Sequence, residues 1–366
     1  MKKLLGIYIH IPFCVRKCSY CDFLSGPAEE NVQKAYVEKL EEEIETYTEL
    51  LNSRRTETVF FGGGTPSILE GKEIVHLMDK LRKLGNISEH AEITIEANPG
   101  TVDEEKLMLW KEAGINRISF GLQSADNKEL KLLGRIHTWE QFLENYRLAR
   151  ACGFTNINVD LMSALPGQSV DTWRRTMEQV AALEPEHISA YSLIIEEGTP
   201  FFDFYADHPE LLPDEDAERE MYYETKAFLA SKGYERYEIS NYAKRGYECR
   251  HNLSYWERAD YLGLGLGAAS LLGNVRKSNQ RDLAEYRKGN FEGERELLSP
   301  EAAMEEYFFL GLRKMKGVDW TPYRQQYEKT VEKLIKKGLL EADGNDIRLT
   351  ELGIDVSNCV LAEFLL

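Results

Sequence analysis

The feature that most limits the fold of this chain is a regular alternation of apolar runs and amphipathic runs. Before residue 200, β-prone runs and runs with helical hydrophobic spacing follow one another about six times. Such alternation is typical of a parallel sheet with helices outside it. The sequence predicts strands at residues 4–11, 58–61, 92–97, 117–120, 156–161 and 187–193, and helices at residues 29–51, 71–84, 103–113, 126–133, 138–152 and 169–183.

Polar residues stand just after the predicted strands in several successive units. Glu96, Gln123 and Asp160 do so, as do a cysteine-rich loop and the glycines at 62–64. An open doubly wound sheet binds ligands at one switch point, whereas a barrel binds them at the C-terminal ends of many strands. A site supplied by many strands favours the barrel. The prediction is an α/β fold with a partial (β/α)6 TIM-like barrel.

The loop after the first strand contains Cys14, Cys18 and Cys21 within eight residues. Three thiolates this close can converge on one centre. Structural zinc takes four protein ligands, and a cubane iron–sulfur cluster takes one thiolate per iron. A cluster held by three cysteines would keep one iron open for a small molecule. A zinc site completed by a distant Cys or His, and three free cysteines, are the alternatives.

The spacing Cys-x3-Cys-x-aromatic-Cys, with Tyr20 as the aromatic residue, resembles the signature of the radical S-adenosylmethionine (SAM) enzymes. The resemblance implies a radical SAM barrel with a [4Fe–4S] cluster on Cys14, Cys18 and Cys21. It also implies that SAM binds the open iron through its amino and carboxylate groups. His10, at the end of the first strand, is expected to order the cluster loop rather than to bind metal.

The charge and cysteine pattern exclude other classes of protein. The 366 residues carry a net charge of -17, which argues against a nucleic-acid-binding protein. Cys152, Cys249 and Cys359 are isolated in the sequence, so no secreted disulfide framework is expected. The N-terminal run lacks a signal-peptide cleavage site, and no apolar run approaches the ~18 residues of a membrane span. A cytoplasmic protein is expected.

Three parts are predicted: the barrel at 1–200, a barrel extension at 201–298 and a C-terminal unit at 299–366. In the extension, residues 234–242 are expected to form a strand and the glycine-spaced residues 261–267 a strand or turn against the barrel. The C-terminal unit is predicted to contain helices at 299–312, 321–326, 328–337 and 351–365 and a hairpin around residues 343–345. Helices followed by a hairpin suggest a winged-helix-like domain, with packing or partner binding as its expected role.

The segment Phe-Phe-Gly-Gly-Gly-Thr-Pro, at residues 60–66, resembles a glycine-rich element of the oxygen-independent coproporphyrinogen III oxidases and their relatives. In radical SAM proteins this element meets the methionine amino group. Further residues match SAM-contacting positions of that branch. The resemblance therefore implies SAM contacts at Tyr8, Tyr20, Gly63, Gly64, Thr65, Glu96, Gln123, Arg135 and Asp160.

Two departures set the chain apart from the oxidases. They carry another cysteine where this chain has Phe23, and an N-terminal extension ahead of the first strand. The chain is therefore more similar to the heme chaperones of the branch. The segment His251-Asn252-Leu253-Ser254-Tyr255-Trp256 resembles the HNxxYW motif of heme-handling members, which implies that His251 is a ligand of heme iron. A structural histidine is the alternative, and Cys249 could ligate or shield the same iron.

The resulting expectation is a protein that binds heme and transfers it to an acceptor protein, with the cluster and SAM in support. The first alternative is an enzyme that decarboxylates coproporphyrinogen III by radical SAM chemistry, so enzymatic activity is left open. The second alternative is a zinc-bound structural module. Peripheral association with membrane-bound heme proteins is compatible with the expectation, and so is a homo-oligomer.

Overall fold

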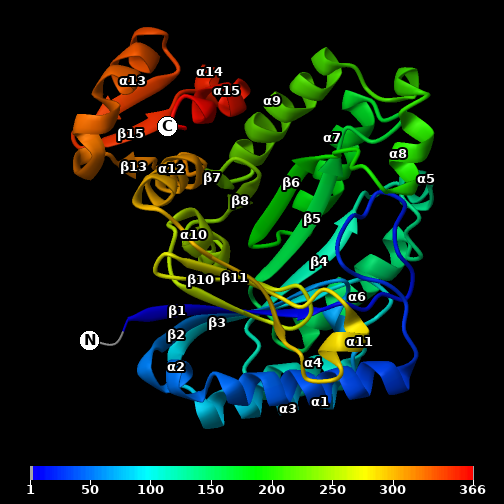
Figure 1. Cartoon of the computed structure of the whole chain (residues 1–366). Coiled ribbons are helices and arrows are strands. Elements are labelled where there is room, and N and C mark those ends of the chain that lie inside the picture. The colour runs from blue at the N-terminus through cyan, green and yellow to red at the C-terminus, as the bar shows by residue number, and fades with distance from the viewer. Residues whose placement is uncertain (1–2, 366) are drawn as a thin grey trace.

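A computed structural model of the chain describes residues 3–365. Its centre is one twelve-stranded sheet in which the first six strands lie side by side in chain order and run parallel. Figure 1 shows this sheet curving, with β1 running across the view and β5 and β6 rising from it. The strands are β1 (Leu4–Ile11), β2 (Arg55–Gly63), β3 (Ile87–Ala97), β4 (Arg117–Gln123), β5 (Ile157–Ser163) and β6 (His187–Ser192).

Helices cover the outer face of these strands (Figure 1). Their inward residues, such as Leu40, Leu77 and Trp110, are fully buried in the main apolar core. Several begin with side-chain caps, which explains where they start; Thr138 and Ser169 both form capping boxes. The helices are α1 (Glu30–Thr46), α2 (Thr48–Ser53), α3 (Gly71–Leu84), α4 (Glu104–Glu112), α5 (Asn127–Leu132), α6 (Trp139–Ala151) and α7 (Val170–Ala181). The predicted partial (β/α)6 barrel is confirmed.

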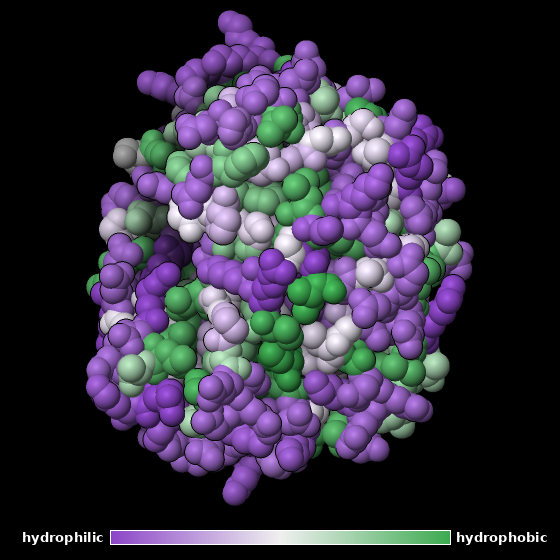
Figure 2. All heavy atoms as spheres, turned by 90° about the vertical axis from the view of Figure 1, so that its right-hand side faces the viewer, coloured by the Kyte–Doolittle hydropathy of each residue, from purple (hydrophilic) through white to green (hydrophobic). Residues whose placement is uncertain are grey.

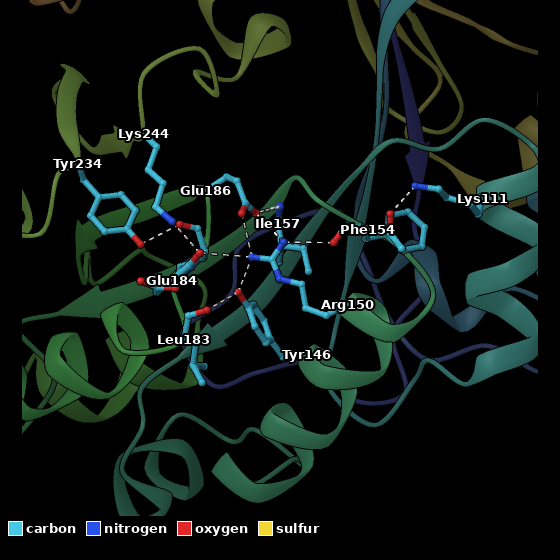
Figure 3. Close-up of polar contacts among 12 residues, drawn as sticks. Lys111, Tyr146, Arg150, Phe154, Ile157, Leu183, Glu184, Glu186, Tyr234 and Lys244 are labelled. Atoms are coloured by element: carbon cyan, nitrogen blue, oxygen red, sulfur yellow. Dashed lines mark hydrogen bonds and ion pairs between the residues drawn. The ribbon is translucent and has the colours of Figure 1, made fainter.

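A polar cluster fastens α6 to the N-terminal ends of β5 and β6. Arg150 is paired with Glu186 at 2.8 Å, and its guanidinium also donates to the Tyr146 hydroxyl (2.6 Å) and to the Phe154 carbonyl (3.1 Å). Glu186 in turn accepts from the backbone N–H of Ile157 (3.0 Å). Figure 3 shows Arg150 at the centre of these contacts. The cluster fixes the helix without occupying the opposite, C-terminal end of the strands.

Both edges of the sheet are extended by later parts of the chain. β8 and β7 continue it beyond β6, while β9 lies parallel to β1 and is followed by β10, β11 and β12. The helix α10 lies beside the starts of β1 and β2, away from the cysteine loop (Figure 1). The elements are α8 (Pro200–Tyr205), α9 (Glu215–Ser231), β7 (Glu235–Glu238), β8 (Asn241–Ala243), α10 (Arg250–Trp256), β9 (Tyr261–Leu264), β10 (Ala269–Leu272), β11 (Val275–Asn279), α11 (Leu283–Tyr286) and β12 (Glu292–Leu297).

The last part of the chain forms a small unit with its own apolar core and a three-stranded sheet of order β13-β15-β14 (Figure 1, orange and red). The predicted hairpin is confirmed, because Asp343 and Asp346 pair across its turn. The elements are α12 (Pro300–Gly311), β13 (Val318–Asp319), α13 (Arg324–Lys336), β14 (Leu340–Asp343), β15 (Asp346–Leu349), α14 (Glu351–Asp355) and α15 (Ser357–Ala362). The exact three-part division of the chain stays a prediction.

Four predictions differ from the structure. The two helices predicted at 321–326 and 328–337 are a short 3-10 turn and one continuous helix, α13. The strand at 234–242 is a hairpin of β7 and β8, because Glu238 accepts from the backbone N–H of Ser240 (2.8 Å) and turns the chain there. The helix at 29–51 divides at Tyr47, and the helix at 351–365 divides at Val356. Strands β11 and β12 were not predicted, because they are rich in charged residues and lack an apolar alternation. No helix within residues 3–365 combines the length and apolarity that crossing a membrane requires.

Candidate functional site

The cysteine loop lies between β1 and α1, and its stem is fixed by backbone hydrogen bonds. The N–H of Cys14 donates to Gly26 O and the N–H of Gly26 donates to Pro12 O, both at 3.0 Å. His10 Nε2 donates to the Leu24 carbonyl (2.9 Å). The other ring nitrogen of His10 therefore accepts from the Tyr8 hydroxyl (3.0 Å). His10 thus ties the end of β1 to the cysteine loop, as the sequence predicted.

The three predicted cluster cysteines face one cavity, and all three are free thiols. Cys14 is buried, while Cys18 and Cys21 are partly exposed. Cys14 Sγ accepts from the Thr65 hydroxyl, and Cys18 Sγ accepts from Arg135 Nη1, each at 3.5 Å. Burial raises the pKa of the Cys21 thiol.

The positions of the three cysteines indicate which kind of metal centre they can hold. Within residues 3–365, no three His, Cys, Asp or Glu side chains are grouped closely enough to hold a single metal ion. A [4Fe–4S] cluster binds one thiolate at each iron, so its ligands need not meet at one point. Three thiols around one cavity, each with a different neighbour, fit this cluster. They do not form the closed tetrahedron of structural zinc.

The glycine run at the end of β2 lets the backbone approach the cysteine loop. A Cβ on Gly64 would lie 2.6 Å from Phe13 O and 2.9 Å from Cys14 Sγ. Gly63 has φ +115°, and a Cβ there would lie 2.6 Å from the His10 ring. Only glycine fits both positions, because both leave too little space for a side chain and Gly63 also has a positive φ. The run therefore serves as a backbone wall beside the thiols.

The cysteines share a cavity of about 450 Å³ with nearly all the predicted SAM contacts. The cavity lies at the C-terminal ends of β2 to β6, where a barrel presents its ligands. Tyr8 is the exception, because it lines a second chamber deeper in the barrel. The predicted contacts that line the first cavity are Tyr20, Gly63, Gly64, Thr65, Glu96, Gln123, Arg135 and Asp160.

Two partly buried carboxyl groups stand in this cavity, Glu96 on β3 and Asp160 on β5, with β4 between them. Burial, together with the nearby Asp160, raises the pKa of Glu96 to about 8. The Gly63 N–H donates to Glu96 Oε2 at 3.1 Å. Burial also raises the pKa of Asp160, although Ser119 (3.1 Å) and Asn158 (2.7 Å) donate to its carboxylate. Two carboxyls in one desolvated cavity favour a cationic ligand.

Arg135 brings a positive charge to the same cavity. One of its nitrogens donates to the side-chain oxygen of Asn98 at 2.8 Å and to the Gly121 carbonyl. Its Nε is buried and has no hydrogen-bond partner among residues 3–365. A free donor beside two carboxyls and three thiols fits an amino-acid-like ligand, with an ammonium on the acids and a carboxylate on the arginine. The donor set therefore fits SAM as well as the cluster.

Gln123 shows a local backbone strain at this site. It has φ +74°, which is uncommon for a residue other than glycine, and the pairing of β4 with β5 shifts between Gly121 and Gln123. Its side-chain oxygen accepts from the Tyr191 hydroxyl at 3.0 Å. The bulge and this hydrogen bond turn the Gln123 amide toward the cavity. Strained residues of this kind gather at ligand sites.

Sequence reasoning missed several residues that line the cavity. Asn98 donates to the Thr65 hydroxyl (2.8 Å) and accepts from Arg135, so it links two predicted contacts. Its position directly after β3 and before Pro99 could have identified Asn98 from the sequence as a residue at the cavity. Ser119, Ser189 and Asn252 gave no such signal, because two lie within strands and the third comes from the distant helix α10.

His251 lies at the other end of the barrel and is closed in by its neighbours. Its side chain is 1% exposed, with Nδ1 2.8 Å from the Thr58 hydroxyl and Nε2 2.9 Å from the Tyr255 hydroxyl. The ring also stacks on Phe60, with 5.0 Å between centroids. Burial lowers the pKa of His251 to about 3, so the imidazole is neutral. Both ring nitrogens are engaged, and an iron ligand here would have to replace one of these hydrogen bonds.

Helix α10 is held in place by a carboxylate from β3. Glu92 accepts the backbone N–H groups of Arg250 and His251, both at 3.0 Å, and faces the Cys249 thiol at 3.6 Å. Burial raises the pKa of Cys249 to about 12, so it is a neutral thiol. His251 and Cys249 are thus brought together, but both are inside the protein and away from the three cluster cysteines.

The mouth of the cluster cavity carries exposed apolar side chains. Phe23 is 60% and Ile194 is 67% exposed, and both line the cavity; Val15 and Ile136 are exposed nearby. Figure 2, which faces the side with the cysteine loop, shows apolar patches in the middle of a largely hydrophilic surface. Exposed apolar groups at a cavity mouth are typical of a surface that meets a hydrophobic ligand or a partner.

The chain matches known protein families and is similar to several known proteins. Residues 8–180 match the family described as the Radical SAM superfamily, and residues 298–356 match the HemN C-terminal domain. The heme chaperone HemW of Lactococcus lactis is 34% identical over 100% of this chain and 98% of its own length. HemW of Bacillus subtilis is 35% identical over 98% of both chains. HemW of Escherichia coli is 42% identical over 72% of this chain and 69% of its own.

A solved structure supports the same relationship. The coproporphyrinogen III oxidase HemN of Escherichia coli, a radical SAM enzyme, matches with a TM-score of 0.84 and 26% sequence identity. The match covers 99% of this chain and 90% of that chain. The two proteins therefore share the barrel and the C-terminal unit. The higher identity over the full chain lies with the proteins named as heme chaperones.

Proposed function

Since this chain belongs to the radical SAM superfamily and, within it, to the family of the HemW heme chaperones, we propose that it binds heme and delivers it to an acceptor protein. Membership of the superfamily implies a [4Fe–4S] cluster and SAM. The observation that carries the proposal is the similarity to heme chaperones over the whole length of the chain. A reducing compartment, the cytoplasm, suits the free thiols and is part of the proposal.

The proposed cluster ligands are Cys14, Cys18 and Cys21, and the proposed SAM contacts are the predicted residues that line the same cavity. When bound, the cluster would supply an open iron that SAM can chelate. Arg135 would hold the carboxylate of SAM, and Glu96 or Asp160 its ammonium or ribose. Gly63 and Gly64 would keep the backbone close to the ligand, and Gln123 would be fixed in place by Tyr191.

We further propose that His251 binds heme iron only in a state in which Tyr255 has moved. The neutral imidazole has the lone pair that an axial ligand needs. Tyr255 occupies its Nε2, and Asn252 lies next to it on the wall of the cluster cavity. A ligand that must displace an internal hydrogen bond binds iron less tightly than a free imidazole. A weaker bond of this kind suits a protein that hands its heme to a partner.

The test is a heme titration of the anaerobically reconstituted protein, followed by absorbance, beside His251→Ala. The matched control is His76→Ala, because His76 is exposed on α3 and far from α10 in the sequence. We expect one heme per chain, with a spectrum that His251→Ala changes and His76→Ala does not. If neither variant alters heme binding, the iron ligand is a residue other than His251. A wild-type protein that binds no heme would contradict the chaperone proposal.

Coproporphyrinogen decarboxylation is the second candidate, because the HemN fold match spans both domains. Against it, Phe23 stands exposed at the cavity mouth where the oxidases carry a cysteine. Incubation with coproporphyrinogen III, SAM and a reductant distinguishes the two functions. Turnover to the divinyl product would favour the enzyme, and heme binding without turnover would favour the chaperone.

A further inference from the structure

A second chamber of about 230 Å³ lies deeper in the barrel than the cluster cavity. The two spaces share Glu96, Ser119, Asp160, Ser189 and Asn252 as a common wall. The remaining residues of the chamber line it alone, and they come from the middle of β1 and β2, from the starts of β4 and β5, and from α10. They are Tyr8, Phe60, Arg117, Asn158, His251 and Tyr255.

Arg117 is the unusual member of this group. Its side chain is among the largest that are fully buried, and the residue is 2% exposed. Its Nε has no hydrogen-bond partner, and no acid lies within ion-pair distance of its guanidinium, among residues 3–365. Buried guanidinium groups are almost always paired, because an unpaired buried charge is costly. Arg117 lines a cavity, and although the nearby Glu92 and Asp160 act on its charge, it forms no ion pair with the anion that would normally accompany it.

The other charged groups around the chamber do not supply that anion. Glu92 is already used by the backbone N–H groups of Arg250 and His251. Asp160 accepts from Ser119 and Asn158, and Glu96 accepts from Gly63 and keeps its proton near pH 7 because of burial. The residues that line the chamber alone therefore carry a single charge, which is positive.

We propose that the inner chamber is a binding site for a small carboxylate with a flat apolar body, which pairs with Arg117 and lies against Phe60 and His251. A carboxylate accepts two parallel hydrogen bonds from a guanidinium, which satisfies the unpaired Nε and the charge together. Phe60 and His251, which stack on each other, supply an aromatic wall. The amide of Asn158 adds a polar neighbour.

The size of the chamber narrows the class of ligand. Sites for drug-sized ligands measure about 300–1,000 Å³, so a space of about 230 Å³ suits a smaller molecule. A tetrapyrrole is excluded from it. The proposed ligand is therefore not heme, and because His251 also lines this chamber, heme iron and the small carboxylate would compete for that residue. Because the wall is shared, this ligand would lie directly behind the ligand of the cluster cavity.

Benzoate and benzamide provide the test, because they have nearly the same shape and differ in charge. Radiolabelled benzoate and benzamide are equilibrated by dialysis with the full-length, anaerobically reconstituted protein at pH 7. We expect one benzoate per chain, bound roughly 10- to 100-fold more tightly than benzamide, which is the range for a charged hydrogen-bonded pair. Equal binding of the two, or no binding of either, would overturn the proposal.

Three variants locate the binding. Arg117→Met is expected to remove the preference for benzoate, while Arg174→Met, a half-exposed arginine on α7, keeps it. Phe60→Trp fills the chamber without changing its charge and is expected to abolish binding of both probes. If Arg117→Met does not fold, Phe60→Trp still tests whether the probes bind in this chamber. If Arg135→Met rather than Arg117→Met removes the preference, the benzoate lies in the cluster cavity and the proposal is wrong.

Discussion

The two ends of the barrel lumen are built in opposite ways. At the cluster end, Cys18 and Cys21 are partly exposed and Arg135 keeps a buried Nε without a partner. At the α10 end, His251 has a hydrogen bond at each ring nitrogen and Glu92 holds the backbone of the helix. Unsatisfied polar groups are costly, so their presence marks a surface prepared for a ligand. The cluster end is ready to bind, whereas His251 at the α10 end must first lose a hydrogen bond before it can bind a ligand.

The two ends also differ in how well a sequence motif predicts an accessible site. The cysteine and glycine motifs place their residues on one open cavity, so spacing in the sequence leads directly to a site. The HNxxYW segment forms a short helix as its spacing suggests, yet the neighbours of His251 come from β2 and from its own helix and close it off. A motif can therefore single out a residue, while the fold decides whether that residue is accessible to a ligand.

The largest effect is expected at the open end. Cys18→Ala removes one of three cluster ligands, and we expect the iron and acid-labile sulfide of the reconstituted protein to fall from about four per chain to near zero. Cys359→Ala, at an exposed cysteine of the C-terminal unit, is the matched control and should retain the cluster. A Cys18→Ala protein with full iron content would show that the triplet is not the ligand set.

The next effect concerns the buried carboxyl at the same end. Glu96→Gln should weaken SAM binding by roughly 10- to 100-fold, because a charged hydrogen-bond acceptor is lost. In the SAM-free protein the same change should stabilise the fold at pH 8. The pKa of Glu96 is raised to about 8, so the native state retains a proton that the unfolded chain loses near pH 4.5. Native stability therefore falls as pH rises from about 4.5 to 8.

Calorimetry measures the affinity of Glu96→Gln for SAM. Denaturant unfolding at pH 5 and pH 8 measures its stability. The stability gain of Glu96→Gln over wild type should be near zero at pH 5 and on the order of 2–4 kcal/mol at pH 8. An equal gain at both pH values would show that Glu96 does not titrate in this range. Unchanged SAM affinity would remove Glu96 from the proposed contacts.

A substitution at Gly64 tests how closely the glycine run approaches the cysteine loop. Gly64→Ala places a Cβ 2.9 Å from Cys14 Sγ and 2.6 Å from Phe13 O, and should cost about 1–3 kcal/mol of unfolding free energy. Gly26→Ala lies in the same loop, meets no atom within 4 Å and should change stability by less than about 0.5 kcal/mol. Denaturant unfolding measures both. Equal effects would mean that the loop shifts freely to accept the new side chain.

The smallest effect is expected at the closed end. Tyr255→Phe frees Nε2 of His251 and should tighten heme binding by roughly 2- to 10-fold, the value of one internal hydrogen bond. Tyr327→Phe removes a comparable buried hydroxyl, which donates to Phe364 O, from the C-terminal unit and serves as control. Heme titrations of the two variants give the comparison. If Tyr255→Phe leaves heme affinity unchanged, His251 does not bind the iron.

Much of the fold was accessible to sequence analysis for a simple reason. In a parallel barrel the hydrophobic period changes from strand to helix and back, and strand ends meet at one edge. Glu96, Gln123 and Asp160 could therefore be assigned together to one cavity, which the structure contains, whereas Arg135 was assigned to it by the family resemblance. Strands β11 and β12 could not be found, because the half-buried β11 is polar, β12 is exposed at the sheet edge, and neither shows an apolar period.

The local order of residues was enough to predict which residues gather at the open end. The cysteine spacing, the glycines beside it and the polar residues at strand ends all act within short stretches of chain. The closed end and the inner chamber depended on contacts between distant stretches. Thr58 meets His251 across 193 residues, and Glu92 meets Arg250 across 158. Such contacts arise only when the chain folds, because burial and unmet hydrogen bonds belong to the packed structure and to no single segment.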